Sequence, residues 1–399
     1  MHSRYPLAIK NGKGCKLWTV DGKEYYDCVS GIATCCLGHS CDELTSAIQE
    51  QMAKVHHVSN LYLIPEQAAL ANWLTTNSCA EKAFFCNSGA EANEAALKLA
   101  RRHAHDRGID CPVIITALDS FHGRTLCALS ATAQPKYHKG FGYGADNEMV
   151  QGFKYVPYND IDALKAAVQE IQNTPGQGLA AIMMEALQGE GGIIPGNPDF
   201  FSAVRELCDE TGALMICDEV QIGMGRSGKL WGYENLPVEP DVFTSAKALG
   251  GGVPIGAMLA GPKAANVFGP GDHASTYGGN PLACAAGLAV ARYFSDNDVL
   301  TNVQARGDQL LAGLEKISSK YPAVLGDVRG WGLLQGVECV SADVTNGMIV
   351  QAAMEEGLLL VGAGSNVVRF VPPLIISEEE LDQSLQIFDK AVGKVVAGK

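Results

Sequence analysis

The chain has 399 residues, of which 47% are hydrophobic and 19% are charged, so it can bury at least one large hydrophobic core. Its formal net charge of −14 argues against nucleic acid or an anionic membrane surface as a partner. The N-terminus lacks the apolar core of a signal peptide, no apolar run can cross a bilayer, and the 13 cysteines are scattered without a CxxC pair. We therefore expect a cytoplasmic protein with reduced cysteines and no membrane partner.

The N-terminal segment, residues 1–50, is expected to pack with the C-terminal part of the chain. Its stretch KLWTVDGKEYYDCVSG (16–31) predicts a β-hairpin, and a helix is expected from Asp42.

The middle of the chain alternates continuously apolar runs with amphipathic helices. Helical periodicity is clear over residues 161–171 and over residues 201–208, where Gly212 ends the helix. Apolar strands between such helices predict an α/β fold whose mostly parallel sheet is covered on both faces. We assign residues 51–285 to this large domain. The expected strands lie within residues 82–88, 111–118, 180–187, 213–220, 241–249 and 255–262.

The C-terminal part, residues 286–399, predicts a smaller α+β domain. Residues 327–340 are expected to form one strand, and residues 344–356 a helix that Gly357 ends. Two short strands follow, LLLV and VVRFV. Ser377 and Glu380 form a capping box at the start of the last helix.

Polar residues gather where the predicted strands of the large domain end. Ser88-Gly89-Ala90, Glu185, Asp218-Glu219 and Lys247 all follow apolar runs directly. Ligands of open α/β sheets bind at the carboxyl ends of the strands, so these groups are expected to meet in one crevice.

Three of these features have a chemistry in common. Ser88 and Gly89 open a strongly helical segment, which predicts either an anion site or an ordinary capped helix. Asp218 ends a buried strand and needs a partner, either a protonated ring nitrogen or an arginine. A desolvated Lys247 has a lowered pKa and attacks aldehydes. A phosphate site, a buried aspartate and a Schiff-base lysine together are what pyridoxal 5′-phosphate requires.

The sequence also resembles the class III, fold type I pyridoxal-phosphate aminotransferases. The resemblance runs nearly end to end and is carried by segments such as FFCNSGAEANEAALKLARR, FHGRTLCALSAT, EALQGEGGIIP, ICDEVQIGMGRSGKLW, SAKALGGGVPIGAMLA and STYGGNPLACAAG. It implies a large domain with a seven-stranded sheet and a homodimer with shared active sites. It also implies transfer of the δ-amine of N2-acetylornithine to 2-oxoglutarate, a step of arginine biosynthesis.

The resemblance implies a role for each matching residue. Ser88, Gly89 and Ala90 correspond to the phosphate cup, and Thr276 to a contact with the phosphate in the neighbouring subunit, with Ser275 near the substrate. Around the cofactor ring, it implies stacking by Phe121, cover by Val220, a ring-nitrogen contact for Asp218, a hydroxyl contact for Gln221 and the Schiff base for Lys247.

Two arginines are the expected carboxylate sites. A guanidinium fork suits carboxylates, although either arginine could instead form a structural ion pair. By resemblance, Arg124 binds the carboxylate of N2-acetylornithine and Arg369 binds the α-carboxylate of glutamate and 2-oxoglutarate. Glu185 resembles the family carboxylate that pairs with Arg369 while an ω-amine is bound. His122 has no readable role.

Alternatives remain open at the level of substrate and reaction. They are succinylornithine, ornithine or 4-aminobutyrate aminotransferase, an aminomutase of the same fold, and a non-catalytic protein that binds the cofactor. Ala186, Ile222 and Ser40-Cys41-Asp42 depart from the family pattern without removing a catalytic group. No metal is expected, because the histidine pairs at residues 56–57 and 103–105 lack carboxylates at ligand spacing.

Overall fold

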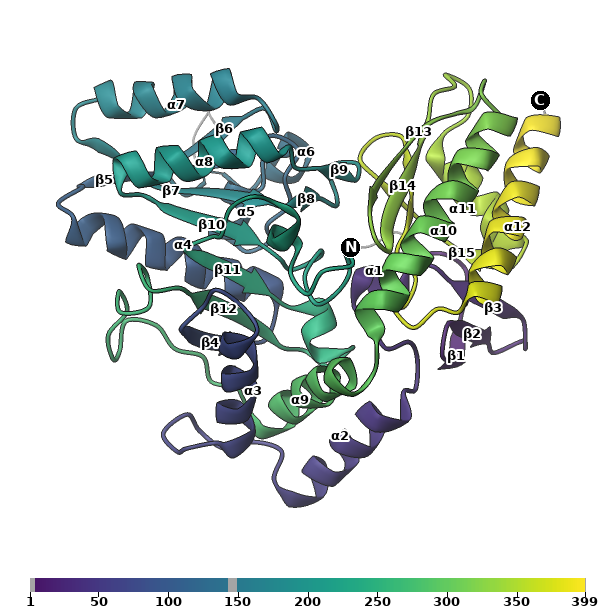
Figure 1. The fold of residues 1–399 in the computed structure, drawn as a ribbon, viewed down its shortest axis with the longest axis horizontal. Coiled ribbons are helices and arrows are strands. Elements are labelled where there is room, and N and C mark those ends of the chain that lie inside the picture. The colour runs from purple at the N-terminus through teal and green to yellow at the C-terminus, as the bar shows by residue number, and fades with distance from the viewer. Residues whose placement is uncertain (1–3, 143–148, 399) are drawn as a thin grey trace.

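The structure is a computed structural model that describes residues 4–142 and 149–398. Two lobes are visible in Figure 1, one built on a seven-stranded sheet and the other on a four-stranded sheet at the C-terminal end of the chain. The predicted α/β fold is confirmed. No helix within the described residues has the length and apolarity needed to span a membrane.

The seven-stranded sheet contains every strand that was expected in the large domain. β12 runs antiparallel to both of its neighbours, and the other pairs of adjacent strands are parallel. The edge strand β6 was missed, because it is only four residues long and mostly half-buried. In spatial order the strands are β4 (Lys82–Cys86), β12 (Gly256–Ala260), β11 (Val242–Ser245), β10 (Leu214–Asp218), β7 (Gln177–Glu185), β5 (Cys111–Ala117) and β6 (Phe153–Val156).

Helices cover both faces of this sheet, as its continuously apolar strands require. α4 (Gly89–Asp106) lies on one face, and α7 (Ile161–Asn173) and α8 (Pro198–Thr211) lie on the other (Figure 1). Successive strand residues alternate between the two cores: Ile216 packs with the α4 side chains, whereas Met215 packs with those of α7 and α8. The remaining helices of this lobe are α3 (Pro65–Thr76), α5 (Leu126–Ala131), α6 (Pro135–His138) and α9 (Pro281–Asp296).

The small lobe corrects one expectation. Residues 327–340 form a hairpin rather than one strand, because Gly332 adopts a left-handed backbone (φ 53°) that turns the chain between β13 and β14. Its sheet has the order β13 (Leu325–Trp331), β14 (Leu334–Cys339), β17 (Val367–Phe370) and β16 (Val361–Ala363). The helices are α10 (Val299–Lys320), α11 (Asn346–Glu355) and α12 (Glu378–Ala397), and Ser377 and Glu380 form the predicted capping box of α12.

The N-terminal segment forms three antiparallel strands, β1 (Ile9–Lys13), β2 (Lys16–Thr19) and β3 (Glu24–Asp27), so the predicted hairpin is confirmed. β3 pairs in parallel with β15 (Leu358–Leu359), which joins this segment to the C-terminal part. The LLLV segment therefore divides between two sheets. α1 (Ser30–Ala33) and α2 (Asp42–Lys54) follow, and α2 packs on α9. The boundaries expected after residues 50 and 285 fall within α2 and α9, and the division into three parts stays a proposal.

Candidate active site

A cavity of about 400 Å³ lies at the carboxyl ends of the central strands, where the polar residues were expected to meet. The cavity is lined by residues from several strand ends and from the loops that follow them. Most of the candidate site residues line it: Ser88, Gly89, Ala90, Phe121, Arg124, Glu185, Asp218, Val220, Gln221 and Lys247. Arg369, Ser275 and Thr276 lie outside this lining.

Lys247 is the first residue of a short 3₁₀ helix that follows β11, and it lines this cavity. Its backbone is left-handed (φ 45°), an uncommon conformation for a residue with a β-carbon. Burial lowers the pKa of the Lys247 ammonium to about 8, even though the nearby Glu190 carboxylate opposes the shift. A large fraction of the amine is therefore neutral and nucleophilic at mildly alkaline pH.

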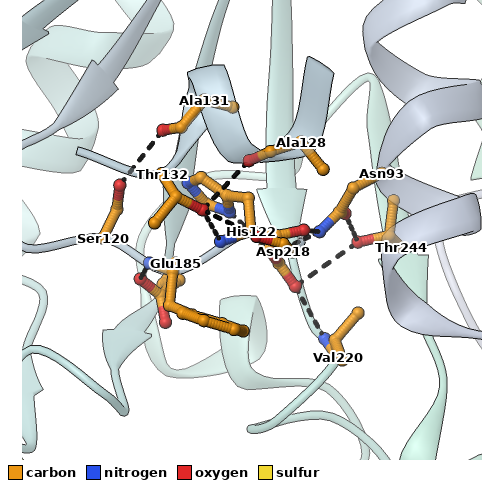
Figure 2. Close-up of polar contacts among 12 residues, drawn as sticks. Asn93, Ser120, His122, Ala128, Ala131, Thr132, Glu185, Asp218, Val220 and Thr244 are labelled. Carbon is orange, nitrogen blue, oxygen red and sulfur yellow. Dashed lines mark hydrogen bonds and ion pairs between the residues drawn. The ribbon is translucent and has the colours of Figure 1, made fainter. Parts of the chain in front are cut away.

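Asp218 is the last residue of β10, and four residues contact its carboxylate, of which Thr244 is the most distant, with Oγ1 3.5 Å from Oδ1 (Figure 2). The Val220 N–H donates to Oδ1 at 3.0 Å, and the Asn93 amide donates to Oδ2 at 2.8 Å. His122 Nδ1 lies 2.7 Å from the same Oδ2. These contacts hold the carboxylate in a fixed position, which suits a partner for a protonated ring nitrogen.

His122 and Asn93 form a polar layer behind Asp218; sequence reasoning left His122 without a role and missed Asn93. The Asn93 side-chain oxygen Oδ1 accepts a hydrogen bond from Thr244 Oγ1 at 2.7 Å. The Asn93 side-chain amide also donates to the backbone carbonyl oxygen of His122 at 2.7 Å (Figure 2). Burial opposes protonation of His122, but the hydrogen bond and charge of Asp218 raise its pKa. The available signal was Asn93 itself, a polar residue on the buried, alanine-rich face of α4.

The N-terminus of α4 opens into the cavity. Ser88 caps it, because its Oγ accepts from the Glu91 N–H at 3.2 Å. The reciprocal contact expected of a capping box is shifted by one residue, since the Glu91 carboxylate accepts from the Asn87 N–H at 2.9 Å. A β-carbon on Gly89 would lie 2.6 Å from Val220 Cγ1, so a larger residue would displace the wall of the cavity. The first N–H groups of a helix have no partner within it, and together with this close approach they fit a phosphate group.

The pairing expected between Glu185 and Arg369 is wrong. Arg369 Nη1 donates to Glu190 Oε1 at 2.5 Å and to Gln221 Oε1 at 2.8 Å, and the guanidinium is buried. Glu185 ends β7 beside Asp218, where the backbone N–H groups of Phe121 and Gly189 donate to its carboxylate.

The two glutamates differ in charge state as well as in position. Burial raises the pKa of Glu185 to about 7. Burial acts in the same direction on Glu190, but the Arg369 charge outweighs it and holds the pKa of Glu190 below its ordinary value. Sequence reasoning missed Glu190; the signal was an acidic residue placed among glycines at residues 189–192.

Arg124 is exposed and stacks over an aromatic pair. Its guanidinium carbon lies 3.7 Å from the ring centre of Tyr137 and 5.2 Å from that of Phe121. Such stacking fixes the plane of the fork while leaving its N–H groups available to an anion. Thr276 is exposed, and the Ser275 hydroxyl accepts from the Gly278 N–H and from the Asn87 amide.

The departures from the family pattern have ordinary environments. Ala186 and Ile222 are buried, and Ser40 has a left-handed backbone just before Asp42, which pairs with Lys13. In the described part of the chain, no group of three or more histidine, cysteine, aspartate or glutamate side chains has the arrangement of a metal site.

Residues 1–392 match the family Aminotransferase class-III, and the chain belongs to this family. An acetylornithine aminotransferase from a Nostoc species is 55% identical over 399 residues, which cover 99% of this chain and 92% of that protein. One from a Synechocystis species is 54% identical, with 99% and 91% of the two chains covered.

Solved structures agree with this assignment. Ornithine aminotransferase from Toxoplasma gondii superposes with a TM-score of 0.93 at 30% identity, covering 100% of this chain and 93% of that one. N-acetylornithine aminotransferase from Stenotrophomonas maltophilia gives 0.85 at 37% identity, with 99% and 98% covered. Another structure of the Toxoplasma enzyme describes partial occupancy of PLP at its active site. The class is one of PLP-dependent transaminases.

Proposed function

We propose that this enzyme transfers the δ-amino group of N2-acetylornithine to 2-oxoglutarate, giving N-acetylglutamate 5-semialdehyde and glutamate in arginine biosynthesis. The observation that carries the proposal is the identity of 50–55% to proteins named acetylornithine aminotransferase over almost the whole chain. The cytoplasm, where the substrates of amino-acid biosynthesis are found, is the proposed location.

The cavity supports pyridoxal 5′-phosphate as the cofactor. When bound, this group supplies an aldehyde for a lysine and a ring that accepts electrons from the substrate. Lys247 would hold the aldehyde, Asp218 the ring nitrogen, and the α4 N-terminus at Ser88, Gly89 and Ala90 the phosphate. The fit rests on the lowered pKa of Lys247, the fixed Asp218 carboxylate and the close approach that only Gly89 permits.

The lining of the cavity supports the remaining ring contacts that we propose. Phe121 and Val220 would cover the two ring faces, and both line the cavity. Gln221 would reach the ring hydroxyl, and its side-chain oxygen also accepts from Arg369. Lys247 Nζ, once free and neutral, would take the proton from the substrate carbon that bears the amine.

The two arginines would divide the substrate carboxylates. Arg124 would bind the carboxylate of N2-acetylornithine, and Arg369 the α-carboxylate of 2-oxoglutarate. Glu190, in place of Glu185, would neutralise Arg369 while the amine donor is bound and release it for the diacid. The short Glu190–Arg369 contact supports this exchange, because a carboxylate of the substrate can replace one of the protein.

We further propose a homodimer in which Thr276 contacts the phosphate held by the partner subunit and Ser275 lies near that substrate. The support is three exposed apolar side chains, since Leu61, Leu63 and Tyr277 are 87%, 100% and 63% exposed. The residue before Leu61, Asn60, donates to the carbonyl oxygens of Ser275 and Gly278, so the two segments are adjacent. Sedimentation of a stable dimer checks this part of the proposal.

The deciding experiment compares amine donors in the first half-reaction. N2-acetylornithine, N2-succinylornithine, ornithine and 4-aminobutyrate are mixed with cofactor-loaded enzyme, and the second-order rate of the cofactor absorbance change is measured. We expect N2-acetylornithine to be fastest. A faster reaction of ornithine would overturn the substrate assignment, and steady turnover without any oxo acid would instead indicate an aminomutase.

A further inference from the structure

A second cavity, of about 640 Å³, shares no lining residue with the candidate active site. Its lining comes mainly from the N-terminal segment, β15 and α11, so it joins the first and last parts of the chain. Its walls are mainly apolar and include Leu17, Val350, Met354 and Leu360. A cavity of this size and lining suits a small apolar ligand.

One corner of this cavity is polar and is formed by Asp27, Cys35 and His39. Asp27 is buried, and its Oδ1 accepts from the backbone N–H groups of Val29 and Ser30, both at 2.9 Å. Its other oxygen lies 2.7 Å from His39 Nε2. The backbone N–H groups therefore hold the Asp27 carboxylate in place, and the carboxylate orients the His39 imidazole. The second ring nitrogen of His39, Nδ1, is not used in this contact.

The imidazole at this corner carries a positive charge at neutral pH. The hydrogen bond that the His39 ring donates to the Asp27 carboxylate is the main reason that the pKa of His39 is raised to about 9, and the neighbouring Cys35 side chain adds to the shift. A fixed cation beside a half-exposed sulfur is the setting in which protein thiols react with electrophiles.

The Cys35 side chain is more accessible than that of the adjacent Cys36. It is half-buried and borders the cavity, whereas the adjacent Cys36 is buried and donates to the Ala248 carbonyl oxygen. Cys111 is a useful reference, because it is exposed at the start of β5 and borders neither of these two cavities.

We propose that Cys35 is a modification site for apolar α,β-unsaturated carbonyl compounds, which bind with their alkyl tails along Leu17, Met354 and Leu360. In the step, sulfur bonds to the β-carbon, the electron pair of the C=C bond moves to the carbonyl oxygen, and the thiol proton ends on the α-carbon. No atom leaves and no oxidant is needed. The His39 cation stabilises the negative charge that develops.

The adduct adjoins the candidate active site. Thr34, the residue before Cys35, lines that cavity. A β-carbon placed on Gly252, which also lines it, would lie 4.0 Å from Cys35 Sγ. An enlarged residue 35 therefore presses on this wall, and modification is expected to slow transamination. This consequence rests on the proposed function, whereas the modification itself does not.

The test treats the cofactor-loaded enzyme with hexyl vinyl ketone and with methyl vinyl ketone, and peptide mass mapping gives the rate of addition at Cys35 and at Cys111. We expect hexyl vinyl ketone to modify Cys35 at least about tenfold faster than Cys111, because methylene burial in the cavity favours the longer tail. Methyl vinyl ketone should show a smaller preference. Cys111→Ser should leave both the Cys35 rate and the enzyme activity unchanged.

His39→Gln, which can still donate to Asp27, should remove most of the preference for Cys35. Equal rates at the two cysteines, or the same preference for both ketones, would overturn the proposal without any variant. Loss of activity that follows Cys35 occupancy and is absent in Cys35→Ser supports the link to the active site. Labelling without loss of activity contradicts that link alone.

Discussion

Arg369 and Glu190 form an ion pair in which Nη1 lies 2.5 Å from Oε1, and Gln221 accepts a second hydrogen bond from the same nitrogen. Gln221 also lines the candidate active site, so the pair is connected to the place where a substrate would lie. Breaking a buried pair by removing one charge leaves the other uncompensated, which makes the two partners separately testable.

Arg369→Ala should damage the second half-reaction selectively. We expect kcat/KM for 2-oxoglutarate to fall on the order of 100-fold, since a buried, hydrogen-bonded charge is lost, and a much smaller loss for N2-acetylornithine. Stopped-flow measurement of each half-reaction checks this. Glu190→Gln is the matched variant and should impair the amine donor more than 2-oxoglutarate. Equal losses in both half-reactions for Arg369→Ala would refute the division of the carboxylates.

His122→Asn should weaken catalysis without preventing folding, because the variant loses the ring contact to the Asp218 carboxylate. Hydrogen bonds to charged groups contribute about 1.5–3 kcal/mol, so kcat should fall roughly 10- to 100-fold. The pH profile of the cofactor absorbance should shift in the same variant. A merely structural role for His122 predicts lower thermal stability with an unchanged pH profile.

Gly89→Ala should weaken cofactor binding, since its β-carbon would meet Val220 at 2.6 Å. Moving that side chain costs about 1–3 kcal/mol, which corresponds to a roughly 5- to 150-fold higher Kd for the cofactor. Fluorescence titration of the cofactor-free protein measures it. Gly347→Ala is the control, because a β-carbon there has its nearest neighbour at 3.7 Å, an ordinary contact. An unchanged Kd in Gly89→Ala would contradict the proposed phosphate position.

Covalent attachment of pyridoxal phosphate to the cofactor-free protein should become faster as the pH rises. Only the neutral amine of Lys247 attacks the aldehyde, and its pKa of about 8 places the increase near pH 8 instead of above pH 10. The rate is followed by absorbance across a pH series. Lys247→Ala should bind the cofactor without a borohydride-reducible bond, and a reducible bond in that variant would assign the attachment to another lysine.

Sequence reasoning predicted the strand ends better than the contacts made there. The periodicity of the apolar runs was sufficient to place Lys247 and Asp218 at one sheet edge, because parallel strands end together. It named Glu185 and missed Glu190 as the partner of Arg369, since the partner depends on how the turn after β7 brings residue 190 to β17. The β13–β14 hairpin was missed because a glycine inside an apolar run does not reveal its φ angle.

The contacts that support Asp218 also could not be predicted from the sequence. Asn93 and Thr244 come from α4 and β11, and they meet only because these elements pack against each other. Resemblance to the family did not help with His122, because the motif FHGRT does not state which atom the imidazole contacts. Tertiary packing determines each of these contacts.

The pairing of Tyr26 with Leu358 has a consequence for synthesis of the chain. On the ribosome, β3 emerges more than 300 residues before the strand that covers its edge. Until translation is nearly complete, that edge offers unsatisfied backbone groups to other nascent chains. Premature termination between Ala260 and Leu358 should therefore yield aggregation-prone fragments, even though the whole seven-stranded sheet has already been made.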